Sequence, residues 1–95
     1  MIIDCIADLH GEYPTLEGGD LLILAGDYTS NDSYQSWIHF ADWLEEQDYK
    51  KKVYIAGNHD NRLVDRDIID DVLYRCDAEY LCDSGTQFEG LNIWG

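Results

Sequence analysis

Three short motifs in the sequence carry side chains of the kinds that bind divalent metal ions. They are Asp8-Leu9-His10, Gly26-Asp27 and Gly57-Asn58-His59-Asp60. Asp and Asn supply carboxylate and amide oxygens, and His supplies an imidazole nitrogen. Such a mixed set suits manganese, iron, zinc or nickel better than calcium or a structural zinc ion. The motifs therefore predict a transition-metal site to which all three contribute.

The metal ligands that we predict are Asp8, His10, Asp27 and Asn58. Side chains at positions i and i+2 of a strand end point the same way, so Asp8 and His10 could bind one ion together. Asp27 has two carboxylate oxygens, enough to bridge two ions, and Asn58 adds a neutral oxygen. Two ions about 3.5–4 Å apart would clamp a phosphoryl group and lower the pKa of a bound water. The resulting hydroxide would be the nucleophile for in-line attack on phosphorus.

His59 follows Asn58 directly, so it cannot reach the same point through the same geometry and is available for another role. A histidine beside the leaving oxygen could donate a proton to it. Asp60 could orient the imidazole and favour its protonated form. His59 and Asp60 are therefore candidate catalytic residues.

The elements that must position these motifs alternate along the chain. Apolar runs bounded by turn residues predict strands at residues 1–7, 21–25, 53–56 and 79–81, then a hairpin of 86–88 with 91–94. Helical spacing of apolar residues predicts helices at about 33–47 and 65–75. Asp32 and Gln35 would form the capping box of the first helix. Lys50-Lys51-Lys52 would follow its C-terminal end, where positive charge suits the helix dipole.

This order of elements is typical of a layered α/β sheet. The run Leu21-Leu22-Ile23-Leu24-Ala25 is continuously apolar, which favours a parallel strand buried on both faces. Sites in open α/β sheets lie outside the carboxyl ends of the strands. Each of the three motifs follows one of the first three strands, so we expect the motifs to meet at one edge of the sheet.

At these residues the chain resembles the calcineurin-like metallophosphoesterases, whose motifs D-x-H, G-D and G-N-H-[DE] each close a strand. The likeness includes the stretch from Gly19 to Asp27 and is close from Ile2 to Asp60. It implies an α/β fold that is the N-terminal half of the family's αββα sandwich. It also implies that residues 1–95 form one metallophosphoesterase domain, incomplete at the C-terminus.

The resemblance implies metal-dependent hydrolysis of a phosphate mono- or diester at a centre of two divalent ions. Asp8 and His10 would hold the first ion, and Asp27 would bridge both. Asn58 would hold the second ion. The family completes its site with later histidines, but this sequence has none after His59. We therefore expect strong binding at neither site, and weaker binding of the second ion.

For the catalytic pair, the resemblance implies that His59 is the general acid and Asp60 its partner. A non-catalytic metal-binding or protein-docking module that retains part of the site is the alternative function. A further segment of chain, or a partner chain in an oligomer, could complete the sheet and supply the remaining ligands.

The net charge of −14, from 20 acidic and 6 basic residues, restricts the partners. It repels phosphate backbones and anionic lipid, so we expect neither direct membrane binding nor non-specific nucleic-acid binding. Bound cations would attract a phosphate ester locally. No C-x-x-C pair occurs, and Asp4 interrupts the only apolar run at the N-terminus. We therefore expect reduced thiols in a cytoplasmic protein.

Three further residues have types that could serve a function, but a structural role is the simpler expectation for each. We expect His39 on the surface of its helix or partly buried, and Trp37 in the core. Arg62 follows the third motif and could contact phosphate, but an ion pair with Asp65 or Asp67 is the simpler expectation.

Overall fold

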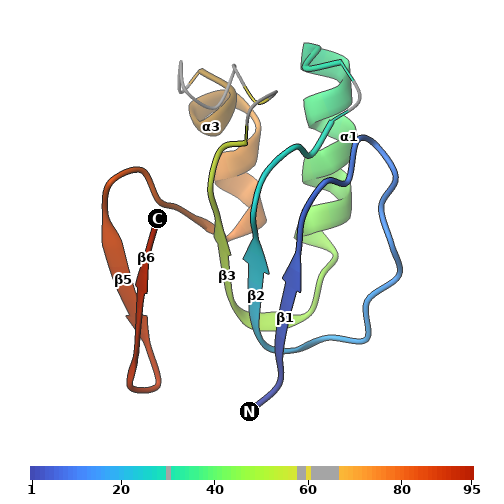
Figure 1. Cartoon of the computed structure of the whole chain (residues 1–95). Helices are drawn as coiled ribbons and strands as arrows, with labels where there is room; N and C mark the ends of the chain where they lie inside the picture. The colour runs from blue at the N-terminus through green and yellow to red at the C-terminus, as the bar shows by residue number, and fades with distance from the viewer. Residues whose placement is uncertain (30, 58–59, 61–66) are drawn as a thin grey trace.

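The fold is a four-stranded parallel sheet with helices on one face and a β-hairpin against the other (Figure 1). The computed structural model describes residues 1–29, 31–57, 60 and 67–95. The sheet has the order β1 (Ile3–Ile6), β2 (Gly19–Leu24), β3 (Tyr49–Tyr54) and β4 (Glu79–Tyr80). The helical elements are α1 (Tyr34–Glu45), α3 (Asp67–Asp71) and the 3₁₀ helix η1 (Leu73–Cys76). The hairpin pairs β5 (Gly85–Phe88) with β6 (Leu91–Trp94). The predicted α/β class with a parallel sheet is confirmed.

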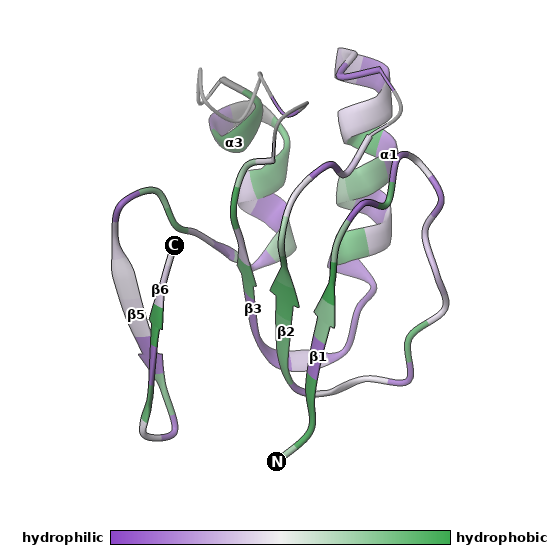
Figure 2. Cartoon of the chain, in the orientation of Figure 1, coloured by the Kyte–Doolittle hydropathy of each residue, from purple (hydrophilic) through white to green (hydrophobic). Residues whose placement is uncertain are grey.

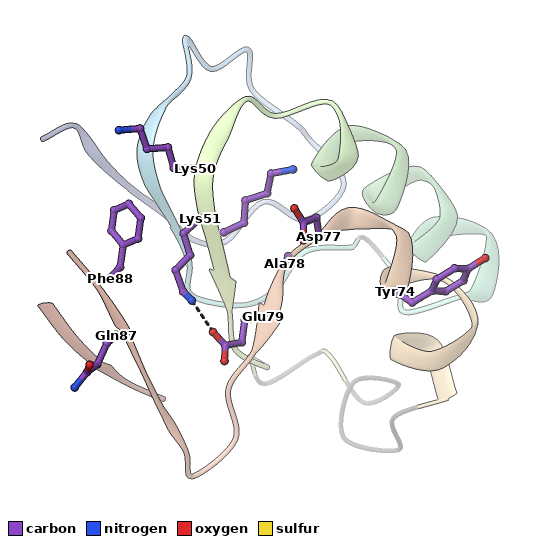
Figure 3. A pocket seen from close by; sticks show the side chains of 9 residues that line it. Lys50, Lys51, Tyr74, Asp77, Ala78, Glu79, Gln87 and Phe88 are labelled. Carbon is purple, nitrogen blue, oxygen red and sulfur yellow. Dashed lines mark ion pairs between the residues drawn. The ribbon is translucent and has the colours of Figure 1, made fainter. Parts of the chain in front are cut away.

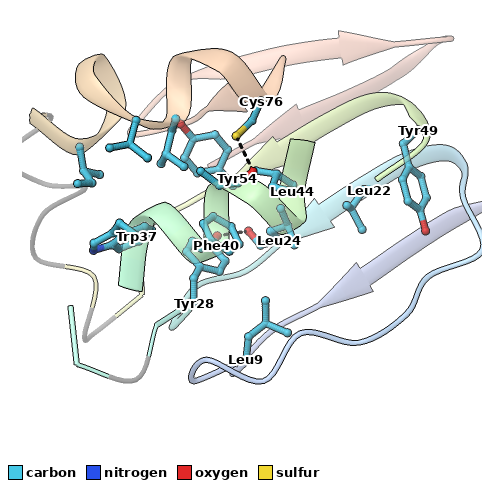
Figure 4. Packing of buried hydrophobic residues seen from close by; sticks show 14 residues of the cluster. Leu9, Leu22, Leu24, Tyr28, Trp37, Phe40, Leu44, Tyr49, Tyr54 and Cys76 are labelled. Atoms are coloured by element: carbon cyan, nitrogen blue, oxygen red, sulfur yellow. Dashed lines mark hydrogen bonds between the residues drawn. The ribbon is translucent and has the colours of Figure 1, made fainter. Parts of the chain in front are cut away.

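Both faces of the sheet are apolar along the C-terminal parts of β2 and β3, and each face has its own cover. Leu22, Leu24 and Tyr54 pack with buried residues of α1, α3 and η1 (Figure 4). Leu21 and Val53 point the other way and pack against Leu81 and residues of the hairpin. Side chains alternate between the faces of a strand, so consecutive residues are apolar where the strand is covered on both sides, as in residues 21–24 and 53–54. Figure 2 shows this hydrophobic character along β2 and the upper part of β3.

Aromatic rings fill the layer between the sheet and α1. Tyr28 stacks on Phe40 with ring centroids 4.6 Å apart and planes at 10°. Trp37 meets both rings edge-on, at 6.0 Å from Tyr28 and 5.7 Å from Phe40. All three side chains are fully buried, which confirms the core position predicted for Trp37. Helix α1 thus packs on Tyr28, the residue directly after Asp27.

The N-cap of α1 lies one residue later than predicted, at Ser33 instead of Asp32. Ser33 is the N-cap, has an extended backbone (φ −79°, ψ 157°) and accepts a hydrogen bond from the N–H of Ser36. The predicted capping box of Asp32 and Gln35 is wrong, because Asp32 has φ +58° and its carboxylate accepts the indole N–H of Trp37 at 2.7 Å. His39 is exposed on the helix surface, as expected.

Strand β3 begins earlier than predicted and includes Lys50-Lys51-Lys52. Lys51 forms an ion pair with Glu79 of β4 at 3.0 Å. Lys52 is only 6% exposed, and its Nζ donates to the carbonyl oxygens of Leu44 at 2.8 Å and Cys76 at 3.2 Å. The positive charge expected at the C-terminal end of α1 is therefore supplied by Lys52 of β3.

The C-terminal third follows the predicted order of elements with altered bounds. The single helix predicted at 65–75 is two short pieces, α3 and η1, and residues 65 and 66 lie outside the described residues. The hairpin is confirmed, and its turn residues Glu89 (φ 47°) and Gly90 (φ 89°) have the positive φ values that a tight two-residue hairpin turn requires. Within the described ranges, no helix has the length and apolar character needed to cross a bilayer.

Candidate metal centre

The loops that follow β1 and β2 leave the carboxyl ends of these neighbouring strands (Figure 1). They bring three side chains together. One ligand atom from each of Asp8, His10 and Asp27 lies within 4.8 Å of the other two. Asp8 and His10 are exposed, and Asp27 is partly buried. The carboxyl ends of parallel neighbours meet at the same edge, so the pairing of β1 with β2 accounts for this convergence.

Backbone hydrogen bonds hold the two loops in register beyond the strands. The N–H of Asp8 donates to the carbonyl oxygen of Gly26 at 3.1 Å, and that of His10 donates to Asp27 at 2.9 Å. The N–H of Gly11 then donates to the carbonyl oxygen of Tyr28 at 3.1 Å. Each ligand residue is thus tied to its neighbour by main chain, which limits how far the ligand atoms can separate.

All three candidate ligand residues have a left-handed backbone. The φ angles are 56° for Asp8, 48° for His10 and 58° for Asp27. Residues with a Cβ pay about 1–2 kcal/mol for this conformation, although Asp and His adopt it more readily than most. Such outliers persist only where the surrounding structure determines them strongly, and they are common at functional sites.

Buried residues beside the ligands supply that surrounding structure. Leu9, between Asp8 and His10, is 7% exposed and packs into the main core. Tyr28, next to Asp27, is fully buried. Its Oη lies 2.8 Å from the carbonyl oxygen of Leu24 and 2.5 Å from that of Ile55, and it accepts the N–H of Ile55 at 3.2 Å. Burial raises the pKa of the Tyr28 phenol, so this link between β2 and β3 stays uncharged.

Asp60 joins the ends of β2 and β3 through one carboxylate. The residue is 1% exposed. Its Oδ2 accepts the N–H of Asp27 at 2.6 Å and that of Gly57 at 2.8 Å, and its Oδ1 accepts the N–H of Tyr28 at 3.2 Å. Three N–H donors compensate the burial of the carboxylate. This contact with the backbone of the ligand loop was absent from the sequence-based interpretation of Asp60.

Tyr13 extends the same network on the side of the first loop. Its hydroxyl donates to the carbonyl oxygen of Tyr28 at 2.9 Å, and its ring stacks on Trp43 with centroids 5.4 Å apart. Burial, together with the nearby charge of Asp60, raises the pKa of Tyr13 to about 12. Tyr13 and Tyr28 were not singled out from sequence, although an aromatic residue directly after the Gly26-Asp27 motif is a signal of an anchored loop.

Two of the predicted site residues cannot be compared with this geometry. Asn58 and His59 lie outside the described residues, as does Arg62. Their predicted roles as second-ion ligand, general acid and ion-pair partner stay predictions, as does the orientation of His59 by Asp60.

Comparison with known families adds to this geometry. The family model described as calcineurin-like phosphoesterase matches residues 1–95. The chain belongs to the calcineurin-like phosphoesterase family. The resemblance carried by the three motifs is thereby confirmed, and the parallel sheet is consistent with the N-terminal half of the fold of these phosphoesterases.

The relatives of this phosphoesterase chain are much longer than 95 residues. A UPF0046 protein of Caenorhabditis elegans is 31% identical over 106 residues, which cover 96% of this chain and 37% of that protein. Metallophosphoesterase domain-containing protein 1 of Homo sapiens is 36% identical over 58 residues, or 59% of this chain and 18% of that protein. Probable rhamnogalacturonate lyase C of Emericella nidulans is 39% identical over 59 residues, or 62% of this chain and 6% of that protein. The chain thus spans well under half the length of these curated relatives.

The donor set of Asp8, His10 and Asp27 fits a divalent transition metal. Asp8 and Asp27 offer carboxylate oxygens and His10 an imidazole nitrogen. Metal–ligand bonds of about 2.0–2.2 Å place the ligands of one ion up to roughly 4 Å apart. The observed limit of 4.8 Å is close to this value, so small side-chain adjustments would bring the three atoms onto one ion.

A second concave region lies away from these ligands. It is a groove of about 540 Å³ between β3, β4 and β5, lined by lysines and acidic residues (Figure 3). Lys50 pairs with Asp20 at 3.1 Å, Lys51 pairs with Glu79, and Lys52 donates to backbone carbonyls. Their charges are already engaged, so the groove is a poor site for a phosphate group.

Proposed function

We propose that this chain supplies part of the active site of a metal-dependent hydrolase of phosphate mono- or diesters. The observation that carries the proposal is the convergence of Asp8, His10 and Asp27 within 4.8 Å, in a member of the calcineurin-like phosphoesterase family. Two carboxylates and an imidazole at a sheet edge are a donor set for divalent ions such as Mn²⁺, Fe²⁺, Zn²⁺ or Ni²⁺.

The proposed centre has two ions. Asp8 and His10 would hold the first, Asp27 would bridge both, and Asn58 would hold the second. When bound, the ions supply Lewis-acid activation of the phosphoryl group and of the attacking water. They also offset the charge of Asp8 and Asp27, which would otherwise repel a phosphate ester in a chain of net charge −14.

The proton for the leaving oxygen would come from His59, with Asp60 orienting its ring. Imidazole suits this role because its pKa lies near neutral pH, so it can hold and release a proton under ordinary conditions. The free thiols of Cys5, Cys76 and Cys82 are consistent with a reducing compartment, so we include a cytoplasmic location in the proposal.

Calorimetric titration with Mn²⁺ tests the metal site on the intact protein. Asp27→Ala should abolish or greatly weaken binding, because the variant lacks the bridging carboxylate. The matched control is Asp77→Ala, since Asp77 is also an aspartate with a left-handed backbone (φ 52°). Asp77 is exposed and lies before β4, away from the carboxyl ends of β1 and β2. The control should bind Mn²⁺ like the wild type. Absence of binding by the wild type would contradict the proposal.

Turnover is measured separately, with an aryl phosphate and an aryl phosphodiester as substrates. We expect hydrolysis that requires added Mn²⁺, Fe²⁺, Zn²⁺ or Ni²⁺ and is lost in Asp27→Ala. Tight metal binding without hydrolysis of either substrate would instead support the alternative function, a non-catalytic metal-binding module.

A further inference from the structure

We infer that Asp60 is a positioning residue for the metal ligand Asp27, acting through the backbone of the loop after β2. The inference rests on the proposed metal site. It assigns to Asp60 a contribution to metal affinity that is separate from any orientation of His59.

The hydrogen bonds of Asp60 involve two consecutive amides of the ligand loop. The N–H of Asp27 donates to Oδ2 at 2.6 Å, and the N–H of Tyr28 donates to Oδ1 at 3.2 Å. Successive N–H groups point at one anion only where the backbone leaves the regular conformations, as in the anion-binding turns known as nests. The φ of +58° at Asp27 provides such a departure. One carboxylate therefore determines the backbone conformation on both sides of the Asp27 side chain.

That conformation decides where the ligand oxygens of Asp27 lie. In the left-handed region the Cα–Cβ bond points in a direction that a relaxed loop would not give it. Hydrogen bonds to a charged acceptor are about twice as strong as neutral ones, so Asp60 offsets the cost of holding Asp27 there. The bond from the N–H of Gly57 to Oδ2, at 2.8 Å, also fixes the end of β3 to the same group.

Burial makes Asp60 difficult to replace. At 1% exposure, the carboxylate has little access to water, and its neighbours' amides have no ready substitute acceptor. Asn at this position keeps the shape but offers one acceptor oxygen, and its NH₂ group would face at least one N–H donor. We therefore expect the loop of Asp60→Asn to lose the backbone conformation at Asp27 while the core remains intact.

The test is Mn²⁺ titration of the intact wild type, Asp60→Asn and the matched control Asp4→Asn. The control also removes a carboxylate that accepts a hydrogen bond, from the Tyr49 hydroxyl at 2.5 Å, but at the amino end of the sheet. Loss of a group that orients a metal ligand typically weakens binding by about 10–100-fold. We expect this loss in Asp60→Asn and wild-type affinity in Asp4→Asn, with thermal unfolding measured for both.

The outcomes separate this inference from the proposed function. Wild-type affinity in Asp60→Asn overturns the positioning role and leaves the metal site standing. Equal losses in both variants, in proportion to their loss of stability, also overturn it. A wild type that binds no Mn²⁺ overturns the proposed function and this inference together.

A measurement on the unmutated, metal-free protein covers the case in which Asp60→Asn does not fold. NMR scalar coupling across the hydrogen bond between the amide nitrogen of Asp27 and Cγ of Asp60 should be detectable, and the Asp27 amide should be protected from exchange. An uncoupled, rapidly exchanging Asp27 amide would overturn the positioning role, whatever the variants do.

Discussion

Gly57 lies so close to Asp27 that any side chain at position 57 would collide with this ligand. A Cβ atom added to Gly57 would lie 2.6 Å from Oδ1 of Asp27 and 2.7 Å from its backbone nitrogen. Both distances are shorter than ordinary Cβ contacts. The end of β3 therefore forms a wall of the candidate metal centre, and glycine is needed there for space rather than for backbone flexibility.

Gly57→Ala should weaken Mn²⁺ binding by about tenfold or more, the range expected when the surroundings of a metal ligand are disturbed. The new methyl group must displace either the Asp27 carboxylate or the loop that carries it. Gly85→Ala is the control, because its Cβ would meet the ring of Trp94 at 3.0 Å in the hairpin, away from the ligands. Calorimetric titration compares the two, and equal affinities would show that position 57 does not shape the site.

Leu9→Ala should destabilise the protein by about 2–5 kcal/mol, the usual cost of a leucine-to-alanine cavity in a core. Leu9 lies between Asp8 and His10, is 7% exposed and anchors their loop in the core. Urea unfolding measures the loss, with Leu91→Ala as control because Leu91 is 39% exposed. A Leu9→Ala variant as stable as its control would mean that the first ligand loop is not anchored by the core.

Tyr28→Phe should cost about 1–3 kcal/mol of stability, because the carbonyl oxygens of Leu24 and Ile55 lose the hydroxyl that lies between them. The N–H of Ile55 keeps its direct bond to the carbonyl oxygen of Leu24 at 3.1 Å, so the loss is confined to the hydroxyl. Tyr74→Phe, at a tyrosine that is 72% exposed, should have little effect. Denaturant unfolding of both variants checks the difference, and indistinguishable midpoints would contradict the proposed link.

Stability should fall as the pH rises from about 10 to 12. Burial raises the pKa of Tyr13 and of Tyr49 to about 12, and the hydrogen bond to Asp4 contributes at Tyr49. A free tyrosine titrates near pH 10. The unfolded chain therefore releases these protons first, so the stabilisation is complete below about pH 10 and is lost on passing through the folded pKa values.

Thermal unfolding across this pH range, with tyrosinate absorbance recorded in parallel, measures the effect. Tyr13→Phe should reduce the dependence on pH, because the variant has one phenol fewer to ionise. A melting temperature that stays constant or rises between pH 10 and 12 would contradict the assignment.

The sheet and the edge at which the motifs meet could be predicted from sequence because the signals are local. The apolar run of residues 21–25 ends at Gly26-Asp27, and the run of residues 53–56 ends at Gly57. Parallel strands with polar residues at their carboxyl ends leave few arrangements, so the convergence of Asp8, His10 and Asp27 follows from strand order.

The parts that were missed depend on contacts distant in sequence. Asp60 bonds to the amide of Asp27, 33 residues earlier, and nothing beside Asp60 indicates that partner. Lysine is uncommon in a buried strand. Lys52 can be buried because two carbonyl oxygens, at the C-terminal ends of α1 and η1, accept hydrogen bonds from its Nζ. The cap of α1 was missed for a local reason: the Trp37 indole, five residues further on, donates to the Asp32 carboxylate, and Ser33 is the N-cap.

The left-handed backbone at positions 8 and 27 affects how related sequences should be compared. Two separate reasons favour aspartate there. Its carboxylate can bind a metal ion, and Asp and Asn tolerate positive φ better than most residues. A descendant that lost its metal could keep Asp, or drift to Asn or Gly, without disturbing the loop. Aspartate at these positions in a homologue is therefore weak proof of an active centre. A change to a β-branched residue would mark a loop that has been rebuilt.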